Sequence, residues 1–160
     1  MKAGKNMKED LDKKIYNEYL QGNKEAFEIL YNKYKDKIVF FIYNIVKEYQ
    51  IAEDISQEVF IYIMQNEMKE EYSFKYYVYL VAKSRAINWY NKEKRRKEID
   101  EQYLEKEELV ENDVVELITK NETRKELMQA INKLDAKYKN ALYLVKIEGL
   151  TYKETAEILG

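Results

Sequence analysis

Basic side chains are concentrated in one segment of this sequence, residues 83–97. Seven cations stand there against the single acid Glu93, and they are Lys83, Arg85, Lys92, Lys94, Arg95, Arg96 and Lys97. Four aromatic residues lie just before and inside the segment, at Tyr76, Tyr79, Trp89 and Tyr90. Because cations neutralise phosphates and flat rings stack on unpaired bases, this combination predicts contact with nucleic acid. The alternative for the charged residues is a solubilising tail, and the alternative for the aromatic residues is packing in the core. We expect core packing for Trp89.

An acidic block follows the basic one directly. Residues 98–122 are rich in Asp and Glu, with only Lys106 and Lys120 opposing them. The whole chain carries 28 basic and 30 acidic residues, a net charge of −2, so an average hides this asymmetry. Apolar residues are scattered through the block without a sustained stripe, and residues 98–120 are therefore predicted to be a solvated linker.

Several kinds of chemistry are disfavoured by composition. The chain has neither His nor Cys, which excludes the usual zinc ligands, His-based acid–base catalysis and disulfides. Asp and Glu are spread widely and mark no catalytic site, so we expect neither an enzyme nor a cofactor. The first 20 residues lack the apolar core of a signal peptide. The longest apolar run, residues 38–46, contains Asn44 and is too short to span a bilayer. We expect a cytoplasmic protein without membrane insertion.

The elements that must position these residues are predicted to be helices throughout. Hydrophobic residues make up 46% of the chain, while Pro is absent and Gly occurs four times, so long helices meet few breakers. Apolar residues recur at three- and four-residue spacing from Ala26 to Ile45, after a potential N-cap at Asn23. Similar runs start near Glu53 and at Phe74. Residues 24–97 are predicted to form a three-helix domain, to which residues 1–22 add a short helix or a frayed arm.

A second small helical domain is predicted for residues 121–160. Its first two apolar faces are Leu127, Ala130, Ile131 and Leu134, then Ala141, Leu142, Leu144 and Val145. Gly149 is placed to stop a helix. Thr151 and Glu154 have the spacing of a capping box, which opens a further short helix.

Three stretches together resemble one known family. They are AEDISQEVF at 52–60, FKYYVYLVAKSRAINWYNKEKRR at 74–96 and LDAKYKNALYLVKIEGLTYKETAEILG at 134–160. Their order and spacing are similar to those of sigma-70 superfamily RNA polymerase sigma factors of the extracytoplasmic function type. The resemblance implies an all-α fold with two small helical domains, a region 2 bundle in residues 1–97 and a partial region 4 helix-turn-helix in residues 121–160.

The first stretch is implied to dock on core RNA polymerase. Asp54, Gln57, Glu58 and Ile61 fall on the side of the expected helix opposite Ile55 and Val59. In this family the matching polar face binds a basic coiled coil on the clamp subunit. The alternative for these residues is an ordinary solvated face.

The second stretch is implied to bind and melt the -10 element of promoter DNA. The predicted DNA-binding residues are Tyr76, Tyr79, Lys83, Ser84, Arg85, Asn88, Lys92, Arg95 and Arg96. Phe74 and Tyr77 are expected in the core instead. Where the family commonly has Asn and Asp, this chain has Ser84 and Asn88, which puts the usual promoter sequence in doubt.

The third stretch is similar to the domain that recognises the -35 element. Residues 151–159 would form the supporting helix of the motif, and a recognition helix would follow Gly160. The domain as written is therefore expected to be incomplete and not to read a -35 element, because direct readout in the major groove needs that helix. Many relatives are controlled by an anti-sigma factor, so the resemblance admits such a partner here.

Two other readings compete with a sigma factor. One is a helix-turn-helix DNA-binding transcriptional regulator that acts without polymerase, which leaves the pattern at 52–60 unexplained. The other is a structural helical interaction protein whose basic segment is only a charged patch.

Overall fold

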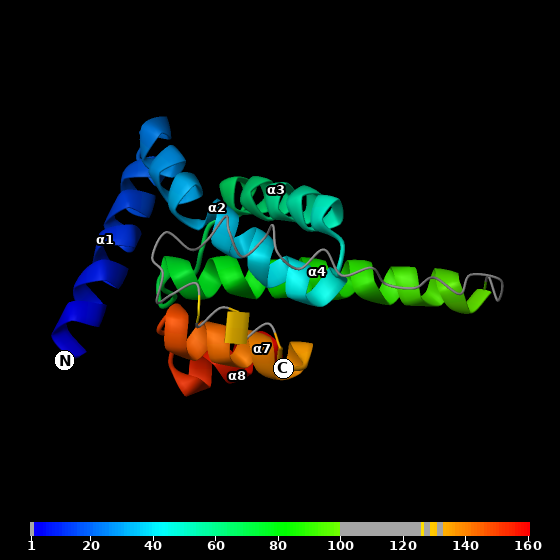
Figure 1. Cartoon of the computed structure of the whole chain (residues 1–160). Helices are drawn as coiled ribbons and strands as arrows, with labels where there is room; N and C mark the ends of the chain where they lie inside the picture. The colour runs from blue at the N-terminus through cyan, green and yellow to red at the C-terminus, as the bar shows by residue number, and fades with distance from the viewer. Residues whose placement is uncertain (1, 100–125, 127–128, 131–132) are drawn as a thin grey trace.

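Every regular element in the described part of the chain is a helix, as predicted (Figure 1). The computed structural model describes residues 2–99, 126, 129–130 and 133–160. The elements are α1 (Lys2–Leu20), α2 (Lys24–Val46), α3 (Tyr49–Gln65), α4 (Phe74–Ile99), α7 (Ala136–Leu142), the π-helix η1 (Tyr143–Ile147) and α8 (Tyr152–Leu159). The predicted linker lies outside the described residues except for its first two positions, which end α4.

Local sequence signals set several of the helix ends. The Asn23 side chain accepts a hydrogen bond from the Glu25 backbone N–H at 3.2 Å, and α2 begins at Lys24 as predicted. Both halves of the capping box between Thr151 and Glu154 are formed at the start of α8. The second periodic run was expected to start near Glu53, but α3 begins at Tyr49, four residues earlier, without a side-chain cap.

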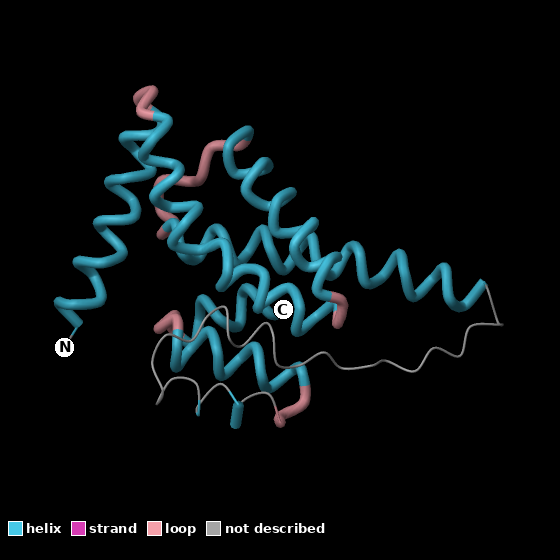
Figure 2. The backbone as a smooth tube through the Cα atoms, turned by 45° about the horizontal axis from the view of Figure 1, so that its top comes forward, coloured by secondary structure: helices cyan, strands magenta, loops and turns pink. Residues whose placement is uncertain are grey.

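Helix α2 is the centre of the fold. Its residues from Ile38 to Asn44 are all buried, on every side of the helix. A helix that is apolar all round must be covered all round, and α2 contacts α1, α3, α4 and α7. Figure 2 shows the other helices arranged around it.

Helix α1 is a regular helix that belongs to the bundle and is not a frayed arm. Asp12 is buried and accepts a hydrogen bond from Lys33 Nζ of α2 at 2.6 Å. Tyr16 is also buried, and its hydroxyl accepts the Met68 backbone N–H at 3.0 Å. The Phe74 ring at the start of α4 lies 5.7 Å from the Tyr16 ring, so α1, α4 and the loop before α4 are fastened at one place.

The second domain packs directly on the first. Helix α7 lies against α2, and α8 lies against α4 (Figures 1 and 2). The turn between η1 and α8 contains Gly149, whose φ of 72° is the left-handed conformation expected at a helix stop. In the described part of the chain, no helix combines the length and the apolar character needed to cross a membrane.

Replacing Phe74 by Ala tests this account of the core. Phe74 is fully buried between the Tyr16 and Tyr34 rings, so Phe74→Ala leaves a cavity and should lower the free energy of unfolding by about 3–5 kcal/mol. Tyr90→Ala, at a ring that is 46% exposed on the same helix, should change it by no more than about 0.5 kcal/mol. Urea unfolding followed by circular dichroism measures the free energy of unfolding of both variants. An equal loss of stability in the two variants would contradict the core described.

Candidate nucleic-acid and polymerase interface

The outer face of α3 presents the predicted docking residues. Asp54, Gln57, Glu58 and Ile61 are all exposed, whereas Ile55 and Val59 on the opposite side are buried in the core. The helix therefore has the two-sided character that its spacing predicts.

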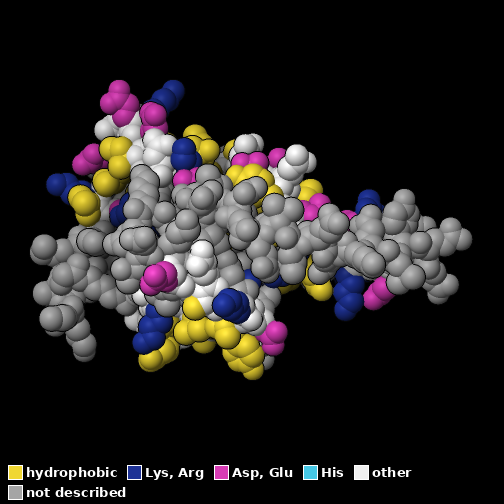
Figure 3. Space-filling view, viewed as in Figure 1, with side chains coloured by type: hydrophobic (Ala, Val, Ile, Leu, Met, Phe, Trp, Pro, Cys, Tyr) yellow, Lys and Arg dark blue, Asp and Glu magenta, His cyan; other side chains and the backbone are white. Residues whose placement is uncertain are grey.

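Sequence reasoning missed Met64 on the same face. Met64 is 50% exposed and Ile61 is 53% exposed, and they stand three residues apart on the helix. Both follow the carboxylates toward the C-terminal end of α3, so the face is acidic at one end and apolar at the other. The signal was available, because Met64 continues the i, i+3 row from Ile61. Figure 3 shows acidic and hydrophobic side chains side by side along the upper surface, where α3 lies in Figure 1.

Helix α4 carries a continuous polar strip on its exposed side. Ser84, Asn88, Lys92 and Arg95 are exposed and follow one another at spacings of four, four and three residues. The end of α4 projects beyond the rest of the bundle (Figure 1), and Figure 3 shows patches of Lys and Arg side chains at the upper and lower edges of that projection. Arg96 is also exposed and forms an ion pair with Glu93 at 2.6 Å. These five predicted DNA-binding residues are open to a ligand.

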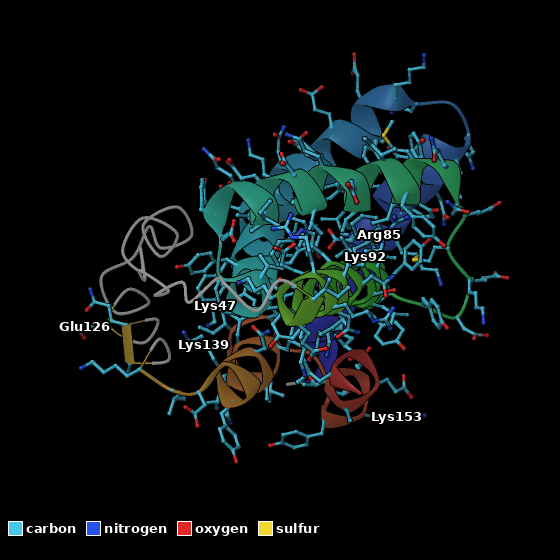
Figure 4. All side chains as sticks on the ribbon, turned by 90° about the vertical axis from the view of Figure 1, so that its right-hand side faces the viewer. Lys47, Arg85, Lys92, Glu126, Lys139 and Lys153 are labelled. Atoms are coloured by element: carbon cyan, nitrogen blue, oxygen red, sulfur yellow. The ribbon has the colours of Figure 1, made fainter. Side chains whose placement is uncertain are left out.

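Arg85 connects the two surfaces. Its guanidinium carbon lies 5.0 Å from the centre of the Tyr62 ring of α3, the geometry of a cation–π contact. The side chain is half-buried there. Figure 4, which views the molecule from the projecting end of α4, labels Arg85 and Lys92 on that helix.

Tyr79 is not where a base-stacking ring must be. It is fully buried, its ring packs edge-on against Phe41 at 5.2 Å, and its hydroxyl lies 3.3 Å from the Tyr143 hydroxyl of η1. Burial raises the pKa of Tyr79 well above its ordinary value, with the nearby Glu148 carboxylate as a second cause. Helix α2 and the second domain enclose the ring, so it is not open to a base in this arrangement, and its role in DNA binding stays a prediction.

Tyr76 is enclosed in the same way. Its side chain is 7% exposed, and its hydroxyl donates a hydrogen bond to Glu157 Oε2 of α8 at 2.9 Å. Burial, followed by that hydrogen bond and the charge of Glu157, raises the pKa of Tyr76 to about 12. Its ring also packs against Tyr72, so no face of it is open for stacking in this structure.

Lys83 is likewise engaged by the second domain. Its ammonium group donates to the Leu159 backbone oxygen at 2.8 Å, and desolvation by burial lowers its pKa. Of the cations predicted to meet phosphates, Lys83 is the one that touches α8.

The remaining rings divide as expected. Phe74 and Tyr77 are buried, and Trp89 is half-buried against the core. Tyr90 is exposed and remains a candidate for stacking.

Sequence reasoning missed Tyr143, which is fully buried against Phe40 with ring centres 5.0 Å apart. The predicted apolar face included Leu142, which the structure leaves 37% exposed.

No metal site accompanies these surfaces in the described residues, where no group of three or more acidic side chains is close enough together to hold an ion. The pattern is one of binding faces: an acidic face with an apolar end, and a cationic strip with hydrogen-bonding groups.

Comparisons with known proteins agree with the two-domain architecture. The sequence model for sigma-70 region 2 matches residues 30–96, which span most of α2, all of α3 and most of α4. The model for sigma-70 region 4 matches residues 124–160, which contain α7, η1 and α8.

Relatives that match over most of their own length are also sigma factors. The RNA polymerase sigma-H factor of Pseudomonas aeruginosa is 27% identical over 94% of this chain and 83% of its own length. The extracytoplasmic function sigma factor SigW of Bacillus subtilis is 28% identical over 92% of this chain and 84% of its own length. SigX of the same organism is 26% identical over 84% of this chain and 73% of its own length. The chain belongs to the sigma-70 family of RNA polymerase sigma factors and is of the extracytoplasmic function type.

Proposed function

We propose that this sigma factor docks on core RNA polymerase through α3 and holds the separated -10 strand along α4. Membership of the family makes the chain a transcription initiation factor, and the proposal assigns the two tasks to two faces. The observation that carries it is the exposure of the acidic face of α3 and the cationic strip of α4 on two helices that pack against each other. We place this activity in the cytoplasm, where the transcribed DNA is.

The α3 face suits a basic partner with an apolar contact point. Asp54 and Glu58 supply charges that steer and align a basic surface, such as one on the polymerase clamp subunit. Ile61 and Met64 supply about half-exposed apolar area that a partner can bury, at roughly 25 cal/mol per Å². Apolar contact provides affinity, and the carboxylates provide orientation.

The α4 strip suits single-stranded DNA. Lys92, Arg95 and Arg96 can neutralise phosphates, while Ser84 and Asn88 are short, exposed side chains that can hydrogen-bond to bases. Tyr90 is the exposed ring that can stack on a base. Holding an unstacked base offsets the few kcal/mol that opening the duplex costs.

The chain supplies binding energy and no bond-making chemistry in this proposal. Phosphodiester formation belongs to the polymerase, and we assign no catalytic residue or cofactor to the sigma factor. A regulator that acts without polymerase would explain α4 but would leave the acidic, partly apolar face of α3 without a role.

Reversing two charges on α3 tests the docking face. Asp54→Lys with Glu58→Lys should abolish co-elution with core RNA polymerase, because like charges then face the basic partner. Glu18→Lys with Glu28→Lys makes the same charge change at exposed positions of α1 and α2 and should leave co-elution intact. Gel filtration with purified core enzyme measures both, and binding that survives the α3 reversal would refute this docking face.

Salt dependence tests the α4 strip. The logarithm of the affinity for single-stranded DNA should fall with the logarithm of salt concentration by about 0.7 per neutralised phosphate. Lys92→Ala with Arg95→Ala should therefore make the slope shallower by about 1.4. Lys14→Ala with Lys24→Ala, which removes two exposed cations elsewhere, should leave it unchanged. Fluorescence anisotropy at several salt concentrations gives the slopes, and equal slopes would remove the strip from the mechanism.

A further inference from the structure

Arg85 points from α4 toward α3 and not along the exposed strip (Figure 4). Successive residues of a helix are turned by about 100° from one another. Arg85 therefore lies on a different side of α4 from the row that contains Ser84 and Asn88. Its guanidinium carbon is 5.0 Å from the centre of the Tyr62 ring, and both side chains are half-buried.

The Tyr62 ring is what attracts the charge of Arg85. Among the described residues, no carboxylate lies within ion-pair distance of Arg85, whereas the electron-rich face of an aromatic ring attracts a guanidinium. A strand that follows the exposed strip runs along the row from Ser84 to Arg95. Reaching a phosphate beside that row would take the guanidinium off the ring, so the contact with Tyr62 and a contact with phosphate compete.

Helix α4 holds the last turn of α3 at a second point. The Tyr77 hydroxyl donates a hydrogen bond to the Asn66 backbone oxygen at 3.1 Å. Asn66 ends α3, and its Nδ2 donates to the Tyr62 backbone oxygen at 2.9 Å. Tyr77 and Arg85 lie about two helical turns apart on α4. Two separated contacts with one turn of α3 fix the rotation of α4 as well as its position.

The rotation of α4 decides which of its side chains a DNA strand meets. Ile61 precedes Tyr62 on α3, and Ser84 precedes Arg85 on α4. The contact is thus made by the immediate neighbours of one residue from each proposed binding face. If α4 turned about its axis while the polymerase held α3, Ser84 and Asn88 would move away from the strand.

We propose that Arg85 is a positioning residue for DNA binding and does not itself neutralise a phosphate. By holding Tyr62, Arg85 sets the rotation of α4 against the docking helix and directs Ser84 and Asn88 toward the separated strand. Tyr62 is its partner in this task. The inference rests on the proposed function of α3 and α4, and it gives Arg85 a different task from the one that the sequence predicts.

Salt dependence separates a positioning residue from a phosphate contact. Arg85→Met keeps a long side chain beside Tyr62 but removes the charge. It should weaken binding to single-stranded DNA by about twofold to thirtyfold, the range of a cation–π contact, and leave the log–log salt slope unchanged. Lys92→Met is the matched control, which removes a proposed phosphate contact and should make the slope shallower by about 0.7.

Fluorescence anisotropy on the full chain at several salt concentrations gives both the affinity and the slope. A slope that becomes shallower by about 0.7 in Arg85→Met would make Arg85 a phosphate contact and overturn the inference. Unchanged affinity in that variant would overturn it as well.

A double-mutant cycle tests whether Arg85 acts through Tyr62. Tyr62→Leu removes the ring and should weaken DNA binding as Arg85→Met does, and the two changes together should be no worse than either alone. Tyr62→Phe keeps the ring and should bind DNA like the native chain, while Arg85→Lys keeps a cation and should recover part of the lost affinity. Losses that add in the double variant would show that the two residues act separately, against the inference.

Circular dichroism checks that every variant keeps its helices, and Arg85→Gln takes the place of Arg85→Met in both comparisons if the Met variant does not. Failure of the proposed function has a different signature. In that case the native chain binds single-stranded DNA without a salt-dependent affinity, and Lys92→Met leaves the slope where it was.

Discussion

The structure depends on the burial of one helix on all of its sides. From Ile38 to Asn44, α2 has no face that water can reach, and each of those large apolar side chains contributes about 1.5–3 kcal/mol only when it is covered. Helices α1, α3 and α4 cover most of it, and α7 covers the rest. This requirement ties the two domains together and places α3 and α4 side by side, with their outer faces free.

The outer faces of α3 and α4 differ in chemistry because each helix packs one side into the core and leaves different side chains on the other. Ile55 and Val59 are buried in the core, so the exposed side of α3 carries Asp54, Gln57 and Glu58. The C-terminal end of α4 projects beyond the other helices (Figure 1). Five of its cations, Lys92, Lys94, Arg95, Arg96 and Lys97, lie near that end of the helix. Arg85 on Tyr62 joins the two faces across the α3–α4 contact, so their relative position is held by packing and by a charge contact.

Region 4 packs on one side of α4 and leaves the strip from Ser84 to Arg95 exposed on another. The same helix that presents a polar strip on one side gives its aromatic side to Tyr143 and Glu157. Tyrosine suits this contact between domains, because its ring packs against apolar neighbours while its hydroxyl bonds to a polar partner.

The sequence by itself determined the helical class, the cap at Asn23, the capping box at Thr151 and the sidedness of α3. All of these follow from interactions between residues a few positions apart, which spacing and side-chain type reveal directly. The exposed polar strip of α4 could be predicted from the sequence for the same reason. The boundaries of the domains remain predictions, since most of the segment between them lies outside the described residues.

Only the tertiary structure decided which aromatic residues are free. Tyr76, Tyr79 and Tyr90 have the same chemistry on one helix, and periodicity assigns each to a face without saying what covers that face. Tyr143 was missed for a related reason: a π-helical turn departs from the 3.6-residue period on which the prediction relied. Asn44 stood out in an apolar run, yet its partner lies 96 residues away, and no local pattern encodes a contact at that distance.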